Sequence, residues 1–349
     1  MRVNVELSDR SYDVVLGDGA RHELAALLKE RAPRARVVAL VTSPSLRAQP
    51  WFHFETGLVQ HVLEMPEGEG AKSLEVLERL CERLAELELS RHDVIVGVGG
   101  GAITDVAGFA AAVYLRGIDL VQVPTSLVGQ VDAAIGGKTA VNLRAGKNLV
   151  GAFHQPLGVL CDFETLVTLP DRERLAGLGE VAKCWLLERR RASELADASL
   201  HELIEVSVRL KADVVANDEF EGGRRAQLNY GHTLAHALEA LALTRHVDEM
   251  RHGEAVAIGL AFAVRLAHRL GRVGANEVAN HDAVLAALGL SARVPALFNT
   301  SELIAAMGHD KKAHHDLTFV LASADGFEVV AGVDPTVVAD VLEEFRGEP

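Results

Sequence analysis

The feature that most constrains the fold is a change of pattern partway along the chain. The first half alternates helical patterns with short β-branched runs, at 35–42 (ARVVALVT), 59–65 (VQHVLEM), 92–100 (HDVIVGVGG) and 118–124 (IDLVQVP). Strands separated by helices predict βαβ units and a mostly parallel sheet. From about Asp171 the chain consists of long helical stretches, and residues 317–333 predict a late β-hairpin. The sequence therefore predicts an α/β domain over 1–160 and an otherwise all-α domain over 161–349.

The composition agrees with a globular protein of two domains. The 349 residues suit two domains of ordinary size, and hydrophobic residues make up 49% of them, enough for a large core. There are 35 Lys and Arg against 49 Asp and Glu, so the formal net charge is -14. This charge repels nucleic acid and anionic membranes, and we expect neither as a partner.

No targeting or membrane segment is expected. The first sixteen residues alternate like a strand and lack the apolar run of a signal peptide. The weakly charged stretch 94–115 contains Asp105 and five glycines, which predicts strand, loop and helix rather than a membrane span. The three cysteines show no metal-binding spacing, as expected for reduced thiols. We therefore expect a cytoplasmic protein.

Two glycine-rich segments in the first half are candidates for binding phosphate groups. Gly99–Gly101 follows a strand and opens a helix, so backbone amides and the helix dipole can face a pyrophosphate. Its spacing is not the usual dinucleotide fingerprint, and a tight turn that needs glycine for steric reasons is an equal alternative. The second segment, 129–151, is expected to be a loop. It carries lysines among glycines, which suits a phosphorylated ligand.

The helical half contains a candidate metal site. His232 and His236 are spaced i, i+4, so they share a helix face and could both bind zinc. A single histidine on such a helix is more often a core or surface residue. The presence of Glu180 and His252 as further possible ligands favours a metal. Nearby, the basic run Arg189–Arg191 predicts a solvated helix face.

Eight ordered motifs resemble those of the 3-dehydroquinate synthase family. They are GGGAITDVAGFAAAVYLRG, QVPTSLVGQVDAAIGGKTAVN, GKNLVGAFHQP, GEVAK, SVRLKADVV, LNYGHTLAHALE, HGEAVAIG and HDKK, within a match from about Pro66 to Gly332. The resemblance implies an N-terminal NAD-binding α/β domain and a C-terminal helical domain, with the active site in the cleft between them. It also implies NAD and zinc as cofactors, with cobalt as an alternative metal.

The resemblance assigns roles residue by residue. The implied metal ligands are Glu180, His232 and His252, so His236 is not a ligand but acts near the substrate phosphate in proton transfer. Implied NAD contacts are Glu69, Lys72, Gly100, Gly101, Asp105, Thr125, Ser126, Lys138, Lys147, Thr165 and Thr168. Implied substrate contacts are Asp132, Lys138, Asn148, Lys183, Lys211, Arg225, Asn229, His236 and Lys311. Arg116 would reach the phosphate from a partner subunit, which implies a homodimer.

The implied reaction converts 3-deoxy-D-arabino-heptulosonate 7-phosphate to 3-dehydroquinate in the shikimate pathway. NAD would oxidise C5 transiently, phosphate would leave, the hydride would return, and an aldol closure would form the ring. Arg225 and Lys211 would hold the substrate carboxylate.

Three alternatives are weighed against this reaction. Another sugar phosphate cyclase would make a cyclitol from a substrate without a carboxylate, and Lys211, Arg225 and Asn229 together argue against it. A metal-dependent polyol dehydrogenase would not need so many lysines directed at phosphate. A non-catalytic metal-binding protein ranks last.

Two segments depart from the family pattern. Thr42-Ser43-Pro44 stands where many relatives have an Asp that holds the adenosine ribose, which puts that contact in doubt. The segment from Cys184 to Leu200 is also atypical.

Overall fold

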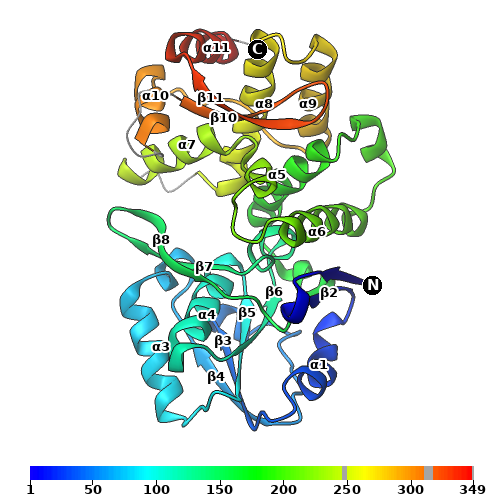
Figure 1. The fold of residues 1–349 in the computed structure, drawn as a ribbon, viewed down its shortest axis with the longest axis vertical. Helices are drawn as coiled ribbons and strands as arrows, with labels where there is room; N and C mark the ends of the chain where they lie inside the picture. The colour runs from blue at the N-terminus through cyan, green and yellow to red at the C-terminus, as the bar shows by residue number, and fades with distance from the viewer. Residues whose placement is uncertain (246–249, 310–316, 348–349) are drawn as a thin grey trace. The chain divides into compact units, whose positions relative to one another are not determined.

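The computed structural model describes residues 1–245, 250–309 and 317–347, and it divides the chain into two compact units (Figure 1). The first unit comprises Met1–Arg174 and Ser207–Phe220, and the second comprises Leu175–Val206 and Glu221–Pro349. The first unit thus extends beyond residue 160, where the sequence pattern placed the boundary. The reason is strand β9 (Gly158–Asp162), which pairs with β2 and β6 inside the sheet of the first unit.

A seven-stranded sheet forms the centre of the first unit. Its order is β1-β2-β9-β6-β5-β3-β4, and every pairing is parallel except that of β1 with β2. The strands other than β9 are β1 (Arg2–Val5), β2 (Tyr12–Gly17), β3 (Val37–Thr42), β4 (Val59–Glu64), β5 (Val94–Gly99) and β6 (Asp119–Pro124). The predicted α/β fold with a mostly parallel sheet is confirmed.

Helices cover both faces of this sheet. Helices α3 (Leu74–Glu86) and α4 (Gly101–Val113) belong to the core on one face, and α1 (Leu24–Arg31) belongs to the core on the other. Strand β3 supplies both cores from alternate residues, because successive side chains of a strand point to opposite faces. A strand buried on both faces must be apolar along its length, which explains the continuous apolar runs in the sequence.

The segment 129–151 is not the loop that its glycines and lysines suggested. It begins with a π-helix (η5, Gly129–Ala133) and continues into a hairpin of β7 (Lys138–Leu143) and β8 (Gly146–Phe153), with a register irregularity between Val141 and Leu143. The hairpin packs closely on α4, since a Cβ atom on Gly108 would lie 2.4 Å from Thr139 Cγ2. Alternate residues of β7 are buried by this contact, and they include Thr139.

Among its described residues, the second unit has helices and one β-hairpin. Its helices are α5 (Asp171–Leu187, from Leu175 on), the start of α6 (Leu200–Asn217), α7 (His232–Thr244), α8 (His252–Arg269), α9 (Ala275–Ala287), α10 (Thr300–His309) and α11 (Pro335–Gly347). Helix α8 is buried along most of its length and packs against α7, α9, α11 and β10. The hairpin of β10 (Leu317–Ala322) and β11 (Phe327–Val333) is the one predicted from the sequence.

The atypical segment after Cys184 connects the end of α5 to α9 through side-chain contacts. Trp185 Nε1 donates to the Arg191 carbonyl at 3.2 Å, and the Arg190 guanidinium lies 4.8 Å from the centre of the Trp185 ring. Arg191 in turn pairs with Glu277 of α9 at 3.0 Å. The prediction that Arg189–Arg191 forms a solvated helix face is wrong about the helix, because α5 ends at Leu187, but the three arginines do contact solvent.

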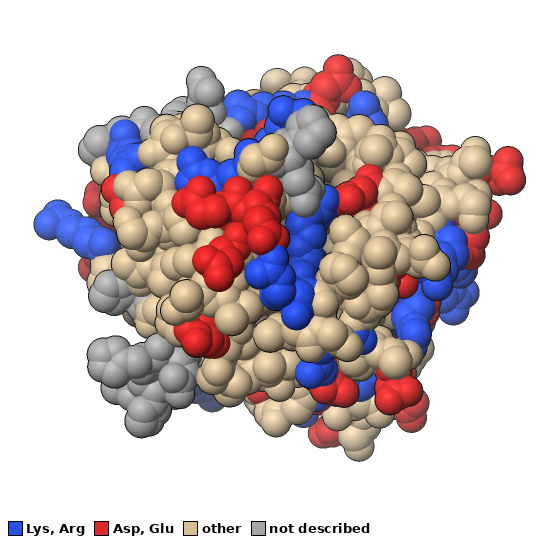
Figure 2. Space-filling model, turned by 90° about the horizontal axis from the view of Figure 1, so that it is seen from above, with Lys and Arg blue, Asp and Glu red and all other residues tan. Residues whose placement is uncertain are grey.

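The surface mixes both signs of charge. Figure 2 shows a stripe of Lys and Arg beside a cluster of Asp and Glu. Ion pairs of the second unit include Arg245 with Glu302 at 2.5 Å and Arg265 with Asp282 at 2.9 Å. Within the described residues, no helix is both long enough and apolar enough to cross a membrane.

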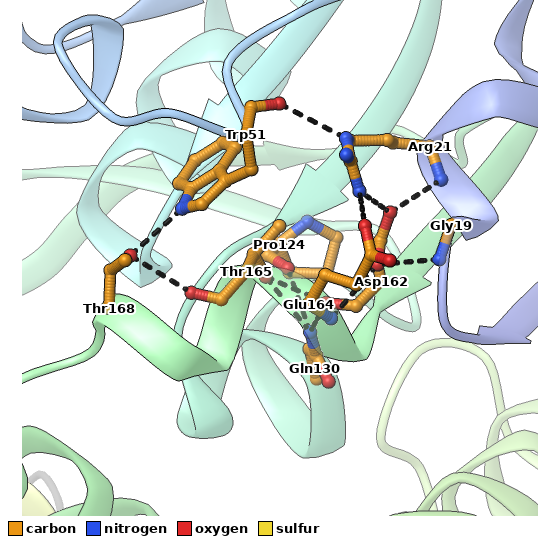
Figure 3. A network of polar contacts seen from close by, with 9 residues as sticks. All are labelled: Gly19, Arg21, Trp51, Pro124, Gln130, Asp162, Glu164, Thr165 and Thr168. Atoms are coloured by element: carbon orange, nitrogen blue, oxygen red, sulfur yellow. Dashed lines mark hydrogen bonds and ion pairs between the residues drawn. The ribbon is translucent and has the colours of Figure 1, made fainter.

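The buried carboxylate of Asp162 organises the end of the sheet (Figure 3). It accepts hydrogen bonds from the backbone N–H groups of Gly19, Arg21 and Glu164 at 3.0–3.1 Å, and from the Arg21 guanidinium at 2.5 Å. Its own carbonyl accepts from Gln130 Nε2 at 2.9 Å. Asp162 is fully buried, so water could not take the place of its carboxylate as the acceptor for these donors.

We predict that Asp162→Ala destabilises the first unit by about 3–5 kcal/mol, because it breaks a buried ion pair and leaves several buried donors without an acceptor. Trp51 lies in the first unit and Trp185 in the second. Urea unfolding followed by Trp51 fluorescence, in a Trp185→Phe background, measures the loss. The matched control is Glu55→Ala, whose carboxylate is 84% exposed and should cost less than about 0.5 kcal/mol. Equal midpoints for the two variants would contradict the assigned role of Asp162.

Candidate functional site

Three possible metal-ligand atoms converge inside the second unit. Glu180 lies in α5, His232 is the first residue of α7, and His252 is the first residue of α8. One ligand atom from each lies within 4.8 Å of the other two. Glu180 Oε1 is 3.4 Å from His232 Nε2 and 3.2 Å from His252 Nε2, and the Glu180 side chain is 1% exposed. A carboxylate and two imidazoles therefore converge on one point, with Glu180 and His232 buried and His252 partly exposed.

The opposite nitrogen of each imidazole is already engaged. His232 Nδ1 lies 3.1 Å from the Tyr230 carbonyl oxygen, and His252 Nδ1 lies 3.0 Å from a carboxylate oxygen of Glu239. A carbonyl oxygen can only accept, so His232 Nδ1 carries the proton, and in the neutral ring Nε2 presents a lone pair. Acceptors on the far side of the ring are the usual way in which proteins orient histidine ligands of a metal.

Charge on the site is balanced by a buried lysine. Lys183 Nζ lies 2.5 Å from Glu180 Oε2, one helical turn along α5. Burial raises the pKa of Glu180, but the Lys183 ammonium and the two histidines outweigh burial, so its pKa lies well below the ordinary value. Burial lowers the pKa of His232. Burial also lowers the pKa of His252, but Glu180 and Glu239 outweigh it and raise that pKa to about 10.

This donor set fits a divalent metal. The three ligand atoms converge on a point that favours positive charge, either a proton on His252 or a metal that replaces it, and a carboxylate with two imidazoles is a common ligand set for zinc. His236 lies outside the set: its side chain is exposed, although its ring centre is 5.4 Å from that of His232. The i, i+4 spacing alone would have chosen His232 with His236, whereas the structure groups His232 with residues from two other helices.

Close contacts between glycines bring the three ligands together. A Cβ atom on Gly253 would lie 1.6 Å from the Ala176 carbonyl oxygen, and one on Gly179 would lie 2.1 Å from the Gly253 carbonyl oxygen. A Cβ atom on Gly259 would lie 1.9 Å from the Gly231 carbonyl oxygen. Gly179, Gly231 and Gly253 are sequence neighbours of Glu180, His232 and His252. The backbones can approach this closely only because these positions have no side chain.

In the first unit, the glycine loop lies at the carboxyl end of a central strand of the sheet. Strand β5 leads through Gly100 into α4, as predicted. Strand β4 lies on one side of β3 and β5 on the other, so the chain reverses direction across the sheet at this point. Open α/β sheets bind ligands at the carboxyl ends of the strands at such a reversal. Gly99 allows the first turn of α4 to pack directly on the end of β5, since a Cβ atom on Gly99 would lie 2.6 Å from Ile103 Cβ.

Several residues assigned to NAD or substrate gather beside this loop. The buried Lys72 ammonium forms an ion pair with Asp105 and donates to Asn148 Oδ1 at 2.5 Å. Glu69 accepts from Asn142 of β7 at 2.6 Å. Burial raises the pKa of Asp105 to about 6, although the Lys72 ammonium lowers it. The β7–β8 hairpin thus holds Asn148 next to residues assigned to NAD.

The residues assigned to the substrate carboxylate lie in buried surroundings. Lys211 Nζ donates to the carbonyl and the carboxylate of Asp132, at 2.6 Å and 2.5 Å, within the first unit. Arg225 is 2% exposed, in a short helix of the second unit (η8, Arg224–Asn229). Asn229 Nδ2 donates to Glu221 at 3.0 Å.

The remaining assigned residues divide between buried and exposed positions. Thr165 is buried and its hydroxyl donates to the Asp162 carbonyl at 2.7 Å, and Thr168 accepts from Trp51 Nε1 at 2.8 Å (Figure 3). Thr125 is buried, and the Ser126 hydroxyl accepts from the Gly129 N–H at 3.1 Å. Gly101 begins α4, whereas Lys138, Lys147 and Arg116 are exposed, with Arg116 at φ 64°. Lys311 lies outside the described residues.

Sequence reasoning missed two carboxylates. Glu239 lies seven residues after His232, two turns along the same face of α7, and this spacing was a signal for it. Glu67 follows β4 and accepts from the N–H of Ser45, in the turn after β3, at 2.9 Å. Burial raises the pKa of Glu67, but hydrogen bonds from Ser45 and Ser43 outweigh it and keep the pKa below its ordinary value. A carboxylate therefore lies at this turn even though β3 is not followed by Asp.

Comparison with known families places both halves of the chain in one family. The model for the 3-dehydroquinate synthase N-terminal domain matches residues 62–176, and that for the C-terminal domain matches residues 177–313. A relative from Amycolatopsis mediterranei, provisionally named an aminodehydroquinate synthase, is 48% identical over 98% of this chain and 94% of its own. The 3-dehydroquinate synthase of Thermobifida fusca is 44% identical over 99% of this chain and 96% of its own.

Solved structures agree in fold. A 2-deoxy-scyllo-inosose synthase with carbaglucose-6-phosphate, NAD+ and Co2+ has a TM-score of 0.86 and 25% identity, and covers 99% of this chain and 100% of its own. The 2-epi-5-epi-valiolone synthase of Streptomyces hygroscopicus, with NAD+ and Zn2+ bound, has a TM-score of 0.80 and 25% identity, with 98% of each chain covered. Both comparisons support the two-part architecture derived above.

We predict that His252→Ala loses bound metal, whereas His236→Ala keeps it, because His236 lies outside the convergent set. Metal content is measured after purification and reloading with zinc. The two variants remove the same side chain, so each serves as the control for the other. A metal-free His236→Ala protein alongside a loaded His252→Ala protein would show that the ligand set is wrong.

A second expectation concerns the contact between α5 and α8. Gly253→Ala should destabilise the second unit by more than about 3 kcal/mol, or lower its metal content, because the added carbon collides with the Ala176 carbonyl. Gly308→Ala is the control: that helical glycine has open space around it, and alanine there should be neutral or stabilising by up to about 1 kcal/mol. Urea unfolding followed by Trp185 fluorescence in a Trp51→Phe background, with zinc content measured alongside, tests this expectation. Unchanged stability and metal content in Gly253→Ala would contradict the contact.

Proposed function

The chain belongs to the 3-dehydroquinate synthase family, and from this membership we propose that it converts 3-deoxy-D-arabino-heptulosonate 7-phosphate to 3-dehydroquinate and phosphate. It is an enzyme, a lyase of the shikimate pathway. The observation that carries the proposal is the convergence of ligand atoms from Glu180, His232 and His252, in a chain that is 44% identical to a 3-dehydroquinate synthase over nearly its whole length.

We propose NAD and a divalent metal, zinc or cobalt, as the cofactors. Related structures contain NAD+ with Co2+ or Zn2+, and the lone pairs converging on Glu180 suit either cation. The proposed ligands are Glu180, His232 and His252. When bound, NAD accepts and returns a hydride, and the metal polarises substrate oxygen atoms. Lys183 keeps the Glu180 carboxylate ionised and so ready to hold a cation.

The nucleotide is proposed to bind at the glycine loop of the first unit. The loop offers backbone N–H groups at the start of α4, and α4 is long enough for its dipole to favour a pyrophosphate. Lys72 adds a buried positive charge next to Asp105. We propose Glu67, which follows β4, as the carboxylate that meets the adenosine ribose, because it accepts a hydrogen bond from Ser45 in the turn after β3 and its low pKa keeps it an acceptor. The other proposed contacts are Glu69, Gly100, Gly101, Thr125, Ser126, Lys138, Lys147, Thr165 and Thr168.

Cationic side chains are proposed to hold the two anionic ends of the substrate. Arg225 and Lys211 are assigned to the carboxylate, since a guanidinium binds carboxylates with two parallel hydrogen bonds. Asp132 would hold Lys211 in position when no substrate is bound. The phosphate is assigned to Lys138, Asn148, Asn229, His236 and Lys311, with Arg116 supplied by a second subunit of a homodimer. The free thiols of Cys81, Cys161 and Cys184 fit the proposed cytoplasmic location.

A second candidate function is favoured by one comparison. The 48% identity to the provisionally named aminodehydroquinate synthase indicates a substrate in which an amino group replaces one hydroxyl. The carboxylate and phosphate contacts serve either substrate, so both candidates share the same proposed site. They are told apart by offering the purified protein each substrate with NAD and zinc, and measuring phosphate release and product mass.

We expect release of one phosphate for each dehydroquinate formed from the hydroxyl substrate, with no net accumulation of NADH. Sedoheptulose 7-phosphate and glucose 6-phosphate, which lack the carboxylate, should give no cyclic product. Preference for the amino substrate would favour the second candidate. Accumulation of NADH would indicate a polyol dehydrogenase, and a cyclitol product would indicate a different cyclase, so either result would overturn the proposal.

Arg225→Ala should lower turnover by about 30-fold to several thousand-fold, because losing a buried contact to a carboxylate costs about 2–5 kcal/mol. Kinetics are measured with the heptulosonate phosphate and with an analogue that lacks the carboxylate. The wild type should strongly prefer the carboxylate and the variant should lose most of that preference. Arg224→Ala, an exposed neighbour, is the matched control and should keep the preference. An unchanged preference of Arg225→Ala for the substrate with the carboxylate would show that another residue binds the carboxylate.

A further inference from the structure

A tight turn immediately before α7 supplies the carbonyl that orients His232. Tyr230 has φ −58° and ψ 124°, and Gly231 has φ 80° and ψ −15°, the dihedral angles of a type II turn. The third position of such a turn requires positive φ, which only glycine adopts without strain. The Tyr230 carbonyl is the group that lies 3.1 Å from His232 Nδ1.

The orientation of one peptide plane therefore decides which imidazole nitrogen of His232 carries the proton. The type I turn differs from type II mainly by a rotation of the central peptide, which here is the one between Tyr230 and Gly231. That rotation would direct the Tyr230 carbonyl away from His232 Nδ1. Without this acceptor the imidazole could carry its proton on Nε2, the nitrogen that faces Glu180, and would then offer no lone pair to a metal.

A buried hydrogen-bonded pair holds Tyr230 in place. The Tyr230 hydroxyl lies 2.8 Å from His281 Nε2, and both side chains are completely buried. His281 Nδ1 lies 2.8 Å from the Glu277 carbonyl oxygen, one turn earlier in α9. Since a carbonyl only accepts, His281 Nδ1 is the donor, its Nε2 is the acceptor, and the Tyr230 hydroxyl donates to it. The aromatic ring is further enclosed by Phe327, with ring centres 4.7 Å apart.

This polar pair has no part in the proposed chemistry. Neither Tyr230 nor His281 belongs to the convergent set, and Phe at 230 would fill nearly the same volume without needing a partner. A buried polar pair adds little to stability compared with apolar residues of the same size, but it selects one geometry.

We propose that Tyr230 and His281 are positioning residues for the metal site: their hydrogen bond anchors α9 to the turn before α7 and keeps the Tyr230 carbonyl on His232 Nδ1. The inference rests on the proposed metal site, which it deepens. The line of contacts runs from the Glu277 carbonyl through His281 and Tyr230 to His232, entirely within the second unit.

The test measures metal affinity directly. The zinc dissociation constant of the whole chain is determined by competition with a chromophoric chelator, for the wild type and for Tyr230→Phe. Losing the partner that orients a ligating histidine weakens metal binding by about 10- to 100-fold. Tyr230→Phe keeps the carbonyl but releases the turn that holds it, so we expect a loss near the lower end of this range, about tenfold. The absorption spectrum of the Co2+-loaded variant should also change, because the histidine ligand is no longer held in one orientation.

Matched controls separate positioning from a general loss of stability. Tyr12→Phe removes the hydroxyl of another buried tyrosine, which accepts from the Gly136 N–H at 3.0 Å in the first unit. Leu342→Ala weakens the core of the second unit in α11. Both should keep wild-type zinc affinity at temperatures where they are folded. His281→Gln keeps a polar atom near the position of Nε2 and should retain most of the wild-type zinc affinity. His281→Leu has no such atom and should lose affinity as Tyr230→Phe does.

The outcomes are distinct. Unchanged zinc affinity in both Tyr230→Phe and His281→Leu overturns the inference and leaves the proposed function standing. An equal loss in Leu342→Ala also overturns it, because the effect would then follow stability alone. If Tyr230→Phe does not fold, the pair His281→Gln and His281→Leu decides by the same measurement. A wild-type protein that binds no zinc overturns both the inference and the proposed metal site.

Discussion

Direct backbone contact at glycines is the constraint on which the metal-binding part of the molecule depends. Helix α8 meets α5 at Gly253 and Gly179, and it meets the turn before α7 at Gly259 and Gly231. Each candidate ligand is the chain neighbour of one of these glycines. The distance between ligands is therefore set by the backbone, which is stiff, rather than by long side chains. The contact leaves no room for even one added carbon atom, and so the ligand geometry depends on packing throughout the second unit.

Orientation comes from a separate layer of acceptors behind the ligands. The Tyr230 carbonyl and the Glu239 carboxylate determine which nitrogen of each histidine faces Glu180. Lys183 offsets the charge of Glu180. Without a cation, the two carboxylates near His252 favour a proton on that ring, and this is why its pKa is raised. The site is thus arranged for positive charge before any metal arrives.

The sequence predicted the elements whose signals are local. Apolar runs buried on both faces predicted the parallel strands, Gly99–Gly101 predicted the turn from β5 into α4, and 317–333 predicted the hairpin. Prediction from the sequence failed where contacts between residues far apart in the chain determine the local structure or the set of ligands. The 129–151 segment is rich in glycine and lysine, yet packing on α4 makes most of it a hairpin. Helical spacing put His232 with His236, but α5 and α8, which supply the neighbouring ligands, could be assigned only through resemblance to a family. The Tyr230 acceptor leaves no trace, because a backbone carbonyl has no sequence signature, and Glu239 leaves only its spacing of seven residues from His232.

Two imidazoles, each with a protonated Nδ1, are proposed to hold the metal together with Glu180. The proton NMR spectrum of the Co2+-loaded protein tests this directly, because the paramagnetic ion shifts protons on its ligands far from all others. We expect two strongly shifted signals that disappear in D2O, one from the Nδ1–H of His232 and one from the Nδ1–H of His252. Three such signals would mean that a third histidine is a ligand, and one or none would mean that these two histidines do not hold the metal as the structure indicates.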